Sequence, residues 1–274
     1  MTEKIHLMDK RDTQEINNHA AVLGINIKYS DEVERFTNLK EHIYTYSPPE
    51  PPNVAELLFI TDPADWDNTI RDWAATSSIP QARPLRDRME EIVIPALTKA
   101  IRDDAASIIK QAAPAATKAA TVVNNAVNAG ILSLTDYEGP AHRGTTQHLV
   151  DAKDAIRKLD AYARLVAYVS RYENGARQAY LTAAVIAPPK NLEPLPVEFG
   201  YANKRAITAT PEAHASWRAN LHLNRAYTMD STFETAIGQY AGFTLNPAKT
   251  LTEVHDRANQ IMRSLNENLI DARG

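Results

Sequence analysis

Two long, alanine-rich stretches with helical spacing constrain this chain more than any other feature. The first runs from Pro84 to Ala129, the second from Thr145 to Ala187, and one short polar segment joins them. Forty-odd helical residues span roughly 60–65 Å, whereas a compact domain of this length has a radius of gyration of about 18–19 Å. The stretches therefore predict either helices that break and fold back or an elongated molecule built on a long antiparallel helical hairpin.

Apolar residues recur in the first stretch mostly at steps of three or four residues, as one face of a helix requires. Pro95 and Pro114 lie inside this pattern. Because proline removes a backbone hydrogen bond and clashes with the preceding turn, we expect a kink or a break at each. The pattern leaves open one kinked helix or two or three helices in series.

The second stretch contains no proline and carries two apolar stripes with the heptad-like spacing of a coiled coil. Two stripes predict a helix buried on two sides, by an internal neighbour and, as one option, by another subunit. Asn174-Gly175 is the expected interruption. The stripes are Leu149, Ala152, Ile156, Leu159, Ala163 and Val166, and Tyr162, Leu165, Val169, Tyr172, Ala176, Ala179, Ala183 and Ile186.

Two clusters of prolines, at residues 48–52 and 188–196, divide the chain. Such clusters favour extended backbone and end helices. We predict an N-terminal helical segment, 1–47, docked on the body; a helical hairpin core, 53–187; and a C-terminal helical segment, 201–274.

Capping signals predict further helices in both end segments. They are Gly24 as a C-cap, Ser30 or Asp31 as an N-cap, Thr210 before Pro211, and a capping box from Thr250 to Glu253. The last helix is amphipathic, so it either docks on the body or binds a partner. Its apolar positions are Leu251, Val254, Ala258, Ile261, Leu265 and Leu269.

Strand signals are few. Residues 130–134 and 196–201 are the only candidates, so the sequence predicts an all-α fold with at most a minor β element.

The composition of the chain argues against several classes of function. A net charge of −4 and a pI of about 6.1 argue against broad electrostatic binding to nucleic acid or acidic membranes. The absence of cysteine excludes disulfides, thiolate catalysis and cysteine-ligated metals. The first ten residues contain no apolar leader, and the most apolar long window, 112–132, contains Lys118 and three asparagines, so we expect no membrane span.

The segment 135–148 is the densest in reactive side chains, with His142 and His148 among them. Gly139 and Gly144 have the spacing of a phosphate-binding loop, but the lysine that contacts the phosphates is missing. We interpret the segment as a polar turn in which Thr145 or Thr146 caps the next helix. An enzyme that uses this loop is the alternative.

Two clusters fall short of a metal site. Asp62, Asp65 and Asp67 lack the full calcium-loop pattern, and acidic residues are favoured in a first helical turn. His214 and His222, eight residues apart, lack a third ligand. We therefore expect no metal and no cofactor.

Basic and aromatic residues interleave in the last segment, which suggests nucleic-acid binding as a second alternative. They are Lys204, Arg205, Trp217, Arg218, Arg225 and Tyr227. Because the overall charge is acidic and no known module is present, a tryptophan in the core is the simpler interpretation.

The sequence thus predicts a non-enzymatic structural or assembly protein that packs its helices against copies of itself or a larger complex. No catalytic motif is present. We expect it in the cytoplasm or in a particle assembled there, such as a virion or phage. The residues expected to contact other chains are Val169, Tyr172, Ala176, Val254, Ile261 and Leu265.

Overall fold

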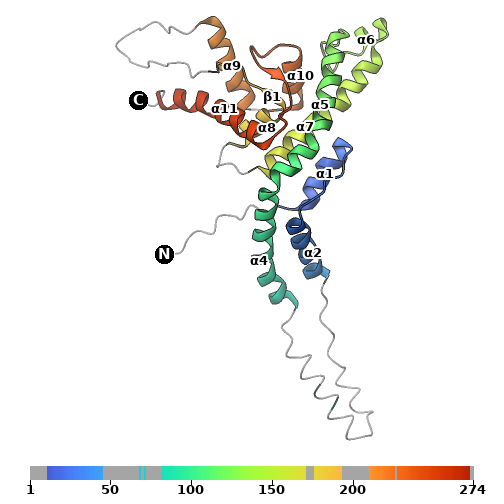
Figure 1. Cartoon of the computed structure of the whole chain (residues 1–274). Coiled ribbons are helices and arrows are strands. Elements are labelled where there is room, and N and C mark those ends of the chain that lie inside the picture. The colour runs from blue at the N-terminus through green and yellow to red at the C-terminus, as the bar shows by residue number, and fades with distance from the viewer. Residues whose placement is uncertain are drawn as a thin grey trace. The chain divides into compact units, whose positions relative to one another are not determined.

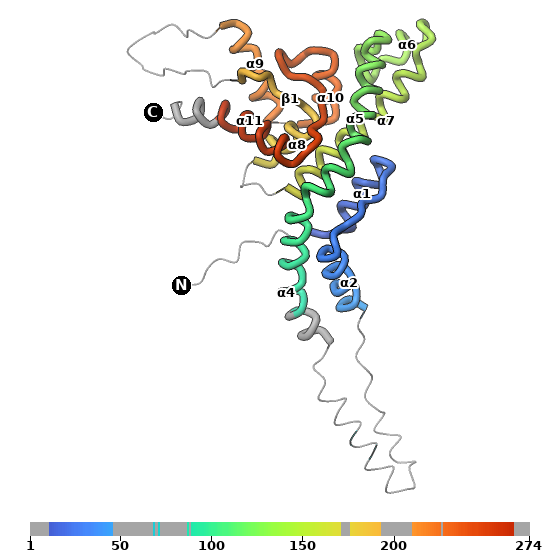
Figure 2. Tube along the Cα trace, viewed as in Figure 1, coloured from blue at the N-terminus to red at the C-terminus, as the bar shows by residue number. Residues whose placement is uncertain are grey.

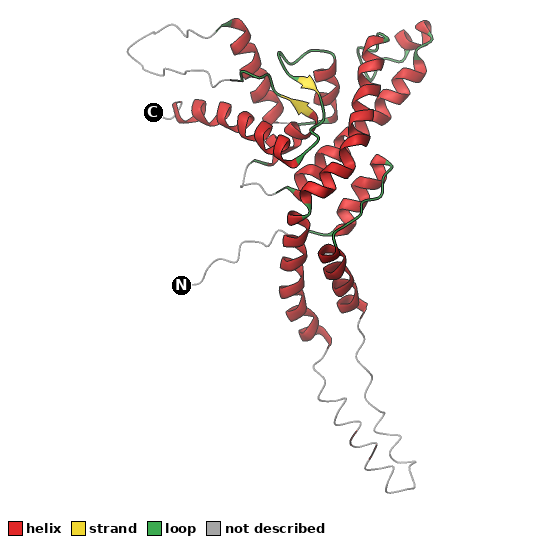
Figure 3. Ribbon diagram, in the orientation of Figure 1, coloured by secondary structure: helices red, strands yellow, loops and turns green. Residues whose placement is uncertain are grey.

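The computed structural model describes residues 11–45, 68, 71, 82–170, 176–192, 210–225 and 227–271. These residues form ten helices and one two-stranded sheet (Figures 1 and 3), which confirms the predicted all-α class with a minor β element. The chain divides into two compact units, Met1–Asp12 with Ser30–Ala100 and Thr13–Tyr29 with Ile101–Gly274. The expected boundaries near residues 47–53 and 187–201 fall largely outside the described ranges, so the three-part division stays a prediction.

The first unit contains α2 (Asp31–Thr45) and most of α4 (Ala82–Asp103). The carbonyl of Ser30 accepts the first intrahelical hydrogen bond, from the Glu34 N–H at 3.0 Å, so Ser30 rather than Asp31 is the N-cap of α2. On α4, Val93 and Leu97 are buried, and the neighbouring Thr98 hydroxyl accepts a hydrogen bond from the Arg11 N–H at 3.1 Å.

The first long stretch forms two helices in series, α4 and α5 (Ala105–Asn128), and the break lies at Asp104. Of the kink or break expected at each proline, a break is excluded, because α4 continues through Pro95 and α5 through Pro114. Ala113 and Ala116, on both sides of Pro114, are buried, and this packing favours a continuous helix despite the hydrogen bond that proline removes.

The centre of the second unit is an antiparallel pair of helices, α5 and α7 (Thr146–Val169), joined through α6 (Glu138–Arg143) (Figures 1 and 2). The buried seam of α5 alternates steps of four and three residues and is mostly alanine, so the two backbones can approach closely. The seam consists of Ala105, Ile109, Ala112, Ala116, Ala119, Val123 and Ala126.

The second long stretch also breaks, with α7 ending at Val169 and α8 (Arg177–Val185) following. The expected interruption at Asn174-Gly175 lies outside the described residues. Both apolar stripes are buried inside the chain wherever they are described, apart from the half-buried Ala176. Helices α5, α8, α10 and α1 cover α7, so internal neighbours account for both stripes.

The rest of the second unit comprises α9 (Pro211–Arg225), α10 (Met229–Ala236), α11 (Leu251–Asp271) and the strands β1 (Ile186–Ala187) and β2 (Thr244–Leu245). The strands pair antiparallel, with Ile186 opposite Leu245. On α11, Val254, Ala258, Ile261 and Leu265 are buried and Leu251 is half-buried. The helix contacts α8, α9 and α5, so this part of the terminal helix docks on the body.

The strand candidate at 130–134 is wrong. Gly130 adopts a φ of +84°, and the Ser133 hydroxyl accepts a hydrogen bond from the Thr135 N–H at 3.2 Å, so the segment turns instead of extending. The candidate at 196–201 lies outside the described residues.

The predicted caps of α9 and α11 are confirmed. The Thr210 hydroxyl accepts a hydrogen bond from the Ala213 N–H at 3.2 Å, and the Thr250 hydroxyl accepts one from the Glu253 N–H at 3.1 Å. The Glu253 carboxylate accepts from the N–H of Lys249 rather than Thr250, so the reciprocal half of the capping box is shifted by one residue.

Candidate functional site

Helix α1 (Thr13–Leu23) packs on α5 and α7. Its buried apolar residues are Ile16, Ala20 and Leu23, at positions i, i+4 and i+7 of one face. The charges of Asp160 and Arg164 act on His19, whereas Leu23 lies close to Lys158. Helix α1 therefore runs antiparallel to α7 and parallel to α5.

The chain turns away from α5 and α7 directly after Leu23, where α1 ends. Gly24 has a φ of +73°, a region that favours glycine. The Gly24 N–H donates to the Ala21 carbonyl and the Ile25 N–H donates to the Ala20 carbonyl, each at 3.0 Å. These two bonds form a Schellman motif and confirm the predicted C-cap.

The segment after Gly24 then returns along α5. The Lys28 backbone exchanges two hydrogen bonds of 2.8 Å with the Gln111 side-chain amide. Gln111 precedes the part of α5 that contacts Leu23, so the chain does not continue along the helix pair beyond α1.

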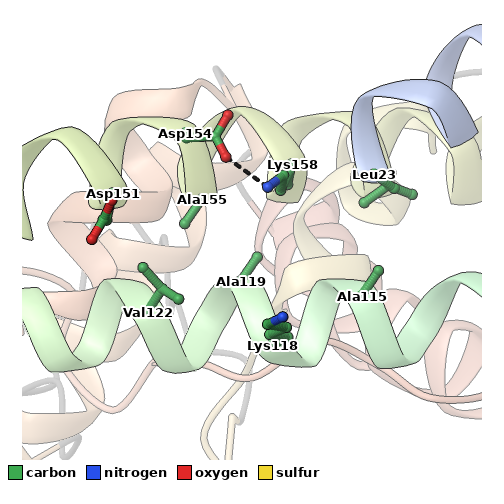
Figure 4. A pocket seen from close by; sticks show the side chains of 9 residues that line it. All are labelled: Leu23, Ala115, Lys118, Ala119, Val122, Asp151, Asp154, Ala155 and Lys158. Atoms are coloured by element: carbon green, nitrogen blue, oxygen red, sulfur yellow. Dashed lines mark ion pairs between the residues drawn. The ribbon is translucent and has the colours of Figure 1, made fainter. Parts of the chain in front are cut away.

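A hollow of about 300 Å³ opens where α1 ends, and we call it the α5–α7 groove (Figure 4). Helix α5 forms one wall and α7 the other, and Leu23 closes the end nearest α1. Its lining residues are Leu23, Ala115, Lys118, Ala119, Val122, Asp151, Asp154, Ala155 and Lys158.

The floor of the groove is small and apolar. Ala119 and Ala155 are 4% and 3% exposed, and Ala115 and Val122 are half-buried. Alanine leaves room above the backbone, so a third helix can approach the pair closely. Ala115 and Val122 are seven residues apart, which corresponds to about 10 Å of helix.

Charges are segregated along the groove. Figure 4 shows Lys118 and Lys158 on the side of Leu23, whereas Asp151 lies at the far end with Asp154 between them. Within α7 the Lys158 ammonium pairs with the Asp154 carboxylate at 2.6 Å, and Asp151 accepts from the Gln147 side chain at 2.7 Å. The two lysines and two aspartates give the groove no net charge, but the end near α1 is positive and the far end is negative.

A second hollow of similar volume lies between the turn at 132–135 and α10. Leu132 and Phe233 line it together with Asp230 and Glu234, and Leu132 is 68% exposed. The α5–α7 groove differs from it, because that groove begins where α1 ends and is formed by the same two helices on which α1 packs.

The residues expected to contact other chains lie mostly inside this one. Val169, Val254, Ile261 and Leu265 are buried, Ala176 is half-buried, and Tyr172 lies outside the described residues. None of them lines the α5–α7 groove. Their contact with other chains stays a prediction.

The polar segment 135–148 is partly helical, because it contains α6. Gly139 therefore lies in a helix and not in a phosphate-binding loop. His142 and His148 are exposed and line neither hollow. Thr145 is the N-cap residue of α7, but its hydroxyl lies 3.5 Å from the Pro140 carbonyl oxygen and does not accept from the helix.

The remaining candidates do not assemble into a site within the described ranges. No group of three His, Asp or Glu side chains there could hold a metal ion. His222 stacks on Tyr240, with ring centroids 5.6 Å apart. The cluster Asp62, Asp65 and Asp67 lies outside the described residues, as do Lys204 and Arg205.

Two further features of the basic segment bear on nucleic-acid binding. Trp217 is half-buried and Tyr227 is buried, so neither ring offers a fully open face for stacking on a base. Arg218 and Arg225 are exposed.

Comparison with known proteins found no match to this chain among family models, curated proteins or solved structures. Within the described ranges, no helix is both long enough and apolar enough to cross a membrane.

Proposed function

We propose that this chain is a non-enzymatic structural or assembly protein that packs its helices against other protein chains, either copies of itself or the components of a larger complex. The carrying observation is the α5–α7 groove, which continues the packing position of α1 and is unfilled by the described residues. A particle assembled in the cytoplasm, such as a virion or phage, is one setting for such a chain.

Three features support this proposal over an enzyme. The groove floor is made of small apolar side chains. Its charged side chains stand at the sides, where they can select a partner without being desolvated at the centre. The histidines of the 135–148 segment are exposed, and neither of them lines either hollow.

The native mass tests the proposal. The purified chain is measured by size-exclusion chromatography with light scattering from micromolar to near-millimolar concentration, and its elution in fresh cell extract is followed with an antibody. We expect a mass above the 30.4 kDa of one chain in at least one of the two settings. A monomer in both would contradict the proposal.

A further inference from the structure

We propose that the α5–α7 groove binds one amphipathic α-helix of a partner protein, which runs in the direction of α1 with acidic residues in its first turn and basic residues in its last. This inference rests on the proposed function and specifies the partner.

The seated helix α1 shows what the groove accepts. It buries Ile16, Ala20 and Leu23 against the same two helices, which amounts to two larger side chains with an alanine between them. The floor of the groove beyond Leu23 contains three alanines, Ala115, Ala119 and Ala155. A partner helix with apolar residues at i, i+4 and i+7 would therefore repeat the packing of α1.

Among the described residues, none fills the groove in line with α1. The left-handed turn at Gly24 and the bonds between Lys28 and Gln111 direct the segment after α1 back along α5. A helix from another molecule can thus enter in line with α1 without displacing the described residues that line the groove.

The charges select the direction of the partner helix. Its end nearest α1 would face Lys118 and Lys158, and its far end would face Asp151, with Asp154 between them and paired with Lys158. Acidic side chains are favoured at helix N-termini and basic ones at C-termini. A helix that runs in the direction of α1 satisfies both requirements, and its N-terminus also meets the negative C-terminal end of α1.

Two designed peptides of about 15 residues are the probe. Both carry alanine and leucine at the helical spacing of α1, and a hydrocarbon staple makes them equally helical. One has glutamates in the first turn and lysines in the last; the other has these residues exchanged. Binding to the full-length protein is measured by fluorescence anisotropy.

The peptide with glutamates first is expected to bind about three- to tenfold more tightly than the exchanged peptide. Lys118→Glu, a change at an exposed residue, should remove or reverse this preference. Ala115→Trp should weaken both peptides at least about tenfold by filling the groove. Asn124→Trp is the matched control, because Asn124 is exposed, half a turn away in phase, and outside the groove lining.

Thermal melting by circular dichroism checks that each variant is folded; if Ala115→Trp unfolds, Lys118→Glu still decides the charge polarity. Equal affinity of the two peptides, or binding that Ala115→Trp leaves unchanged, would overturn the inference. So would a concentration-dependent dimer that Ala115→Trp abolishes while neither peptide binds, since a second copy would then fill the groove. Those results would leave the proposed function intact, whereas a monomer in both purified form and extract would remove it.

Discussion

The hydroxyl of Tyr162, in the middle of α7, donates a hydrogen bond to the backbone carbonyl of Ala248, 2.5 Å away and 86 residues further along the chain. The Ala248 N–H in turn donates to the Ala184 carbonyl at 2.8 Å. The backbone carbonyl of Ala248 thus ties the segment that precedes α11 to α7, and its N–H ties the same segment to α8. Tyr162 has no exposed surface, and burial raises its pKa well above the ordinary value, so it stays protonated and remains a donor.

Tyr162→Phe should lower the free energy of unfolding by about 1–3 kcal/mol, because the Ala248 carbonyl would lose its donor in the core. Urea unfolding followed by circular dichroism measures the change. Tyr137→Phe is the control, since Tyr137 is 57% exposed, and it should change stability by less than about 0.5 kcal/mol. Equal effects of the two substitutions would show that the hydrogen bond contributes nothing.

Val169→Asp should lower the free energy of unfolding by about 3–5 kcal/mol or prevent folding, since Val169 is fully buried and the new carboxylate would have no partner. Val150→Asp lies on the same helix at a side chain that is 51% exposed. It should cost less than about 1 kcal/mol. Thermal melting of both variants checks the assignment of the α7 faces, which a Val169→Asp protein with unchanged melting would contradict.

Gly24→Ala should destabilise the protein by about 1–2 kcal/mol, because the φ of +73° at this position places an alanine side chain in a strained conformation. Gly24→Asn should cost less, since asparagine tolerates this region better than other residues. Chemical unfolding of the two variants measures which one has the lower free energy of unfolding. An alanine variant as stable as the natural protein would mean that the turn after α1 can rearrange.

His19 should make stability depend on pH. Burial lowers its pKa below the ordinary 6.5; the carboxylates of Glu15 and Asp160 oppose this effect, and the Arg164 guanidinium adds to it. The unfolded chain therefore binds the proton more readily, so the contribution of His19 is present above pH 6.5 and is lost as the pH falls through the lower, folded-state pKa.

His19→Gln should accordingly lose less stability than the natural protein between pH 7 and the mildly acidic range. Urea unfolding at a series of pH values measures this difference. Parallel stability curves for the two proteins would contradict it.

Local chemistry explains what the sequence predicted well. The caps at Gly24, Ser30 and Thr210 each depend on a few adjacent residues, and all three are found. The seams of α5 and α7 followed from periodicity alone. Such features are readable because their physical cause lies within one or two helical turns.

Features with a non-local cause were missed. The pairing of Ile186 with Leu245 joins residues far apart in sequence, and neither short strand has a strong local signal. The helix breaks at Asp104 and continues through Pro95 and Pro114, where a kink or a break was expected, because tertiary packing overrides the preference of one residue.

The α5–α7 groove was missed for the same reason. Its existence depends on how far α1 extends along α5 and α7, which the sequence of neither helix states. Ala115 and Val122 were a signal, since they lie outside the buried seam and widen the apolar face of α5. Because the sequence does not show where α1 ends on α5, it could not show that this wider apolar face of α5 is partly uncovered.

Photo-crosslinking in the cells that produce this protein tests the central claim most directly. A photoreactive p-benzoylphenylalanine replaces either Lys118, inside the α5–α7 groove, or Asn124, outside it on the same helix. The account predicts covalent adducts with another protein at position 118 and not at position 124. Absence of adducts at 118, or the same adducts at both positions, would contradict the claim that this groove is where the chain binds other proteins.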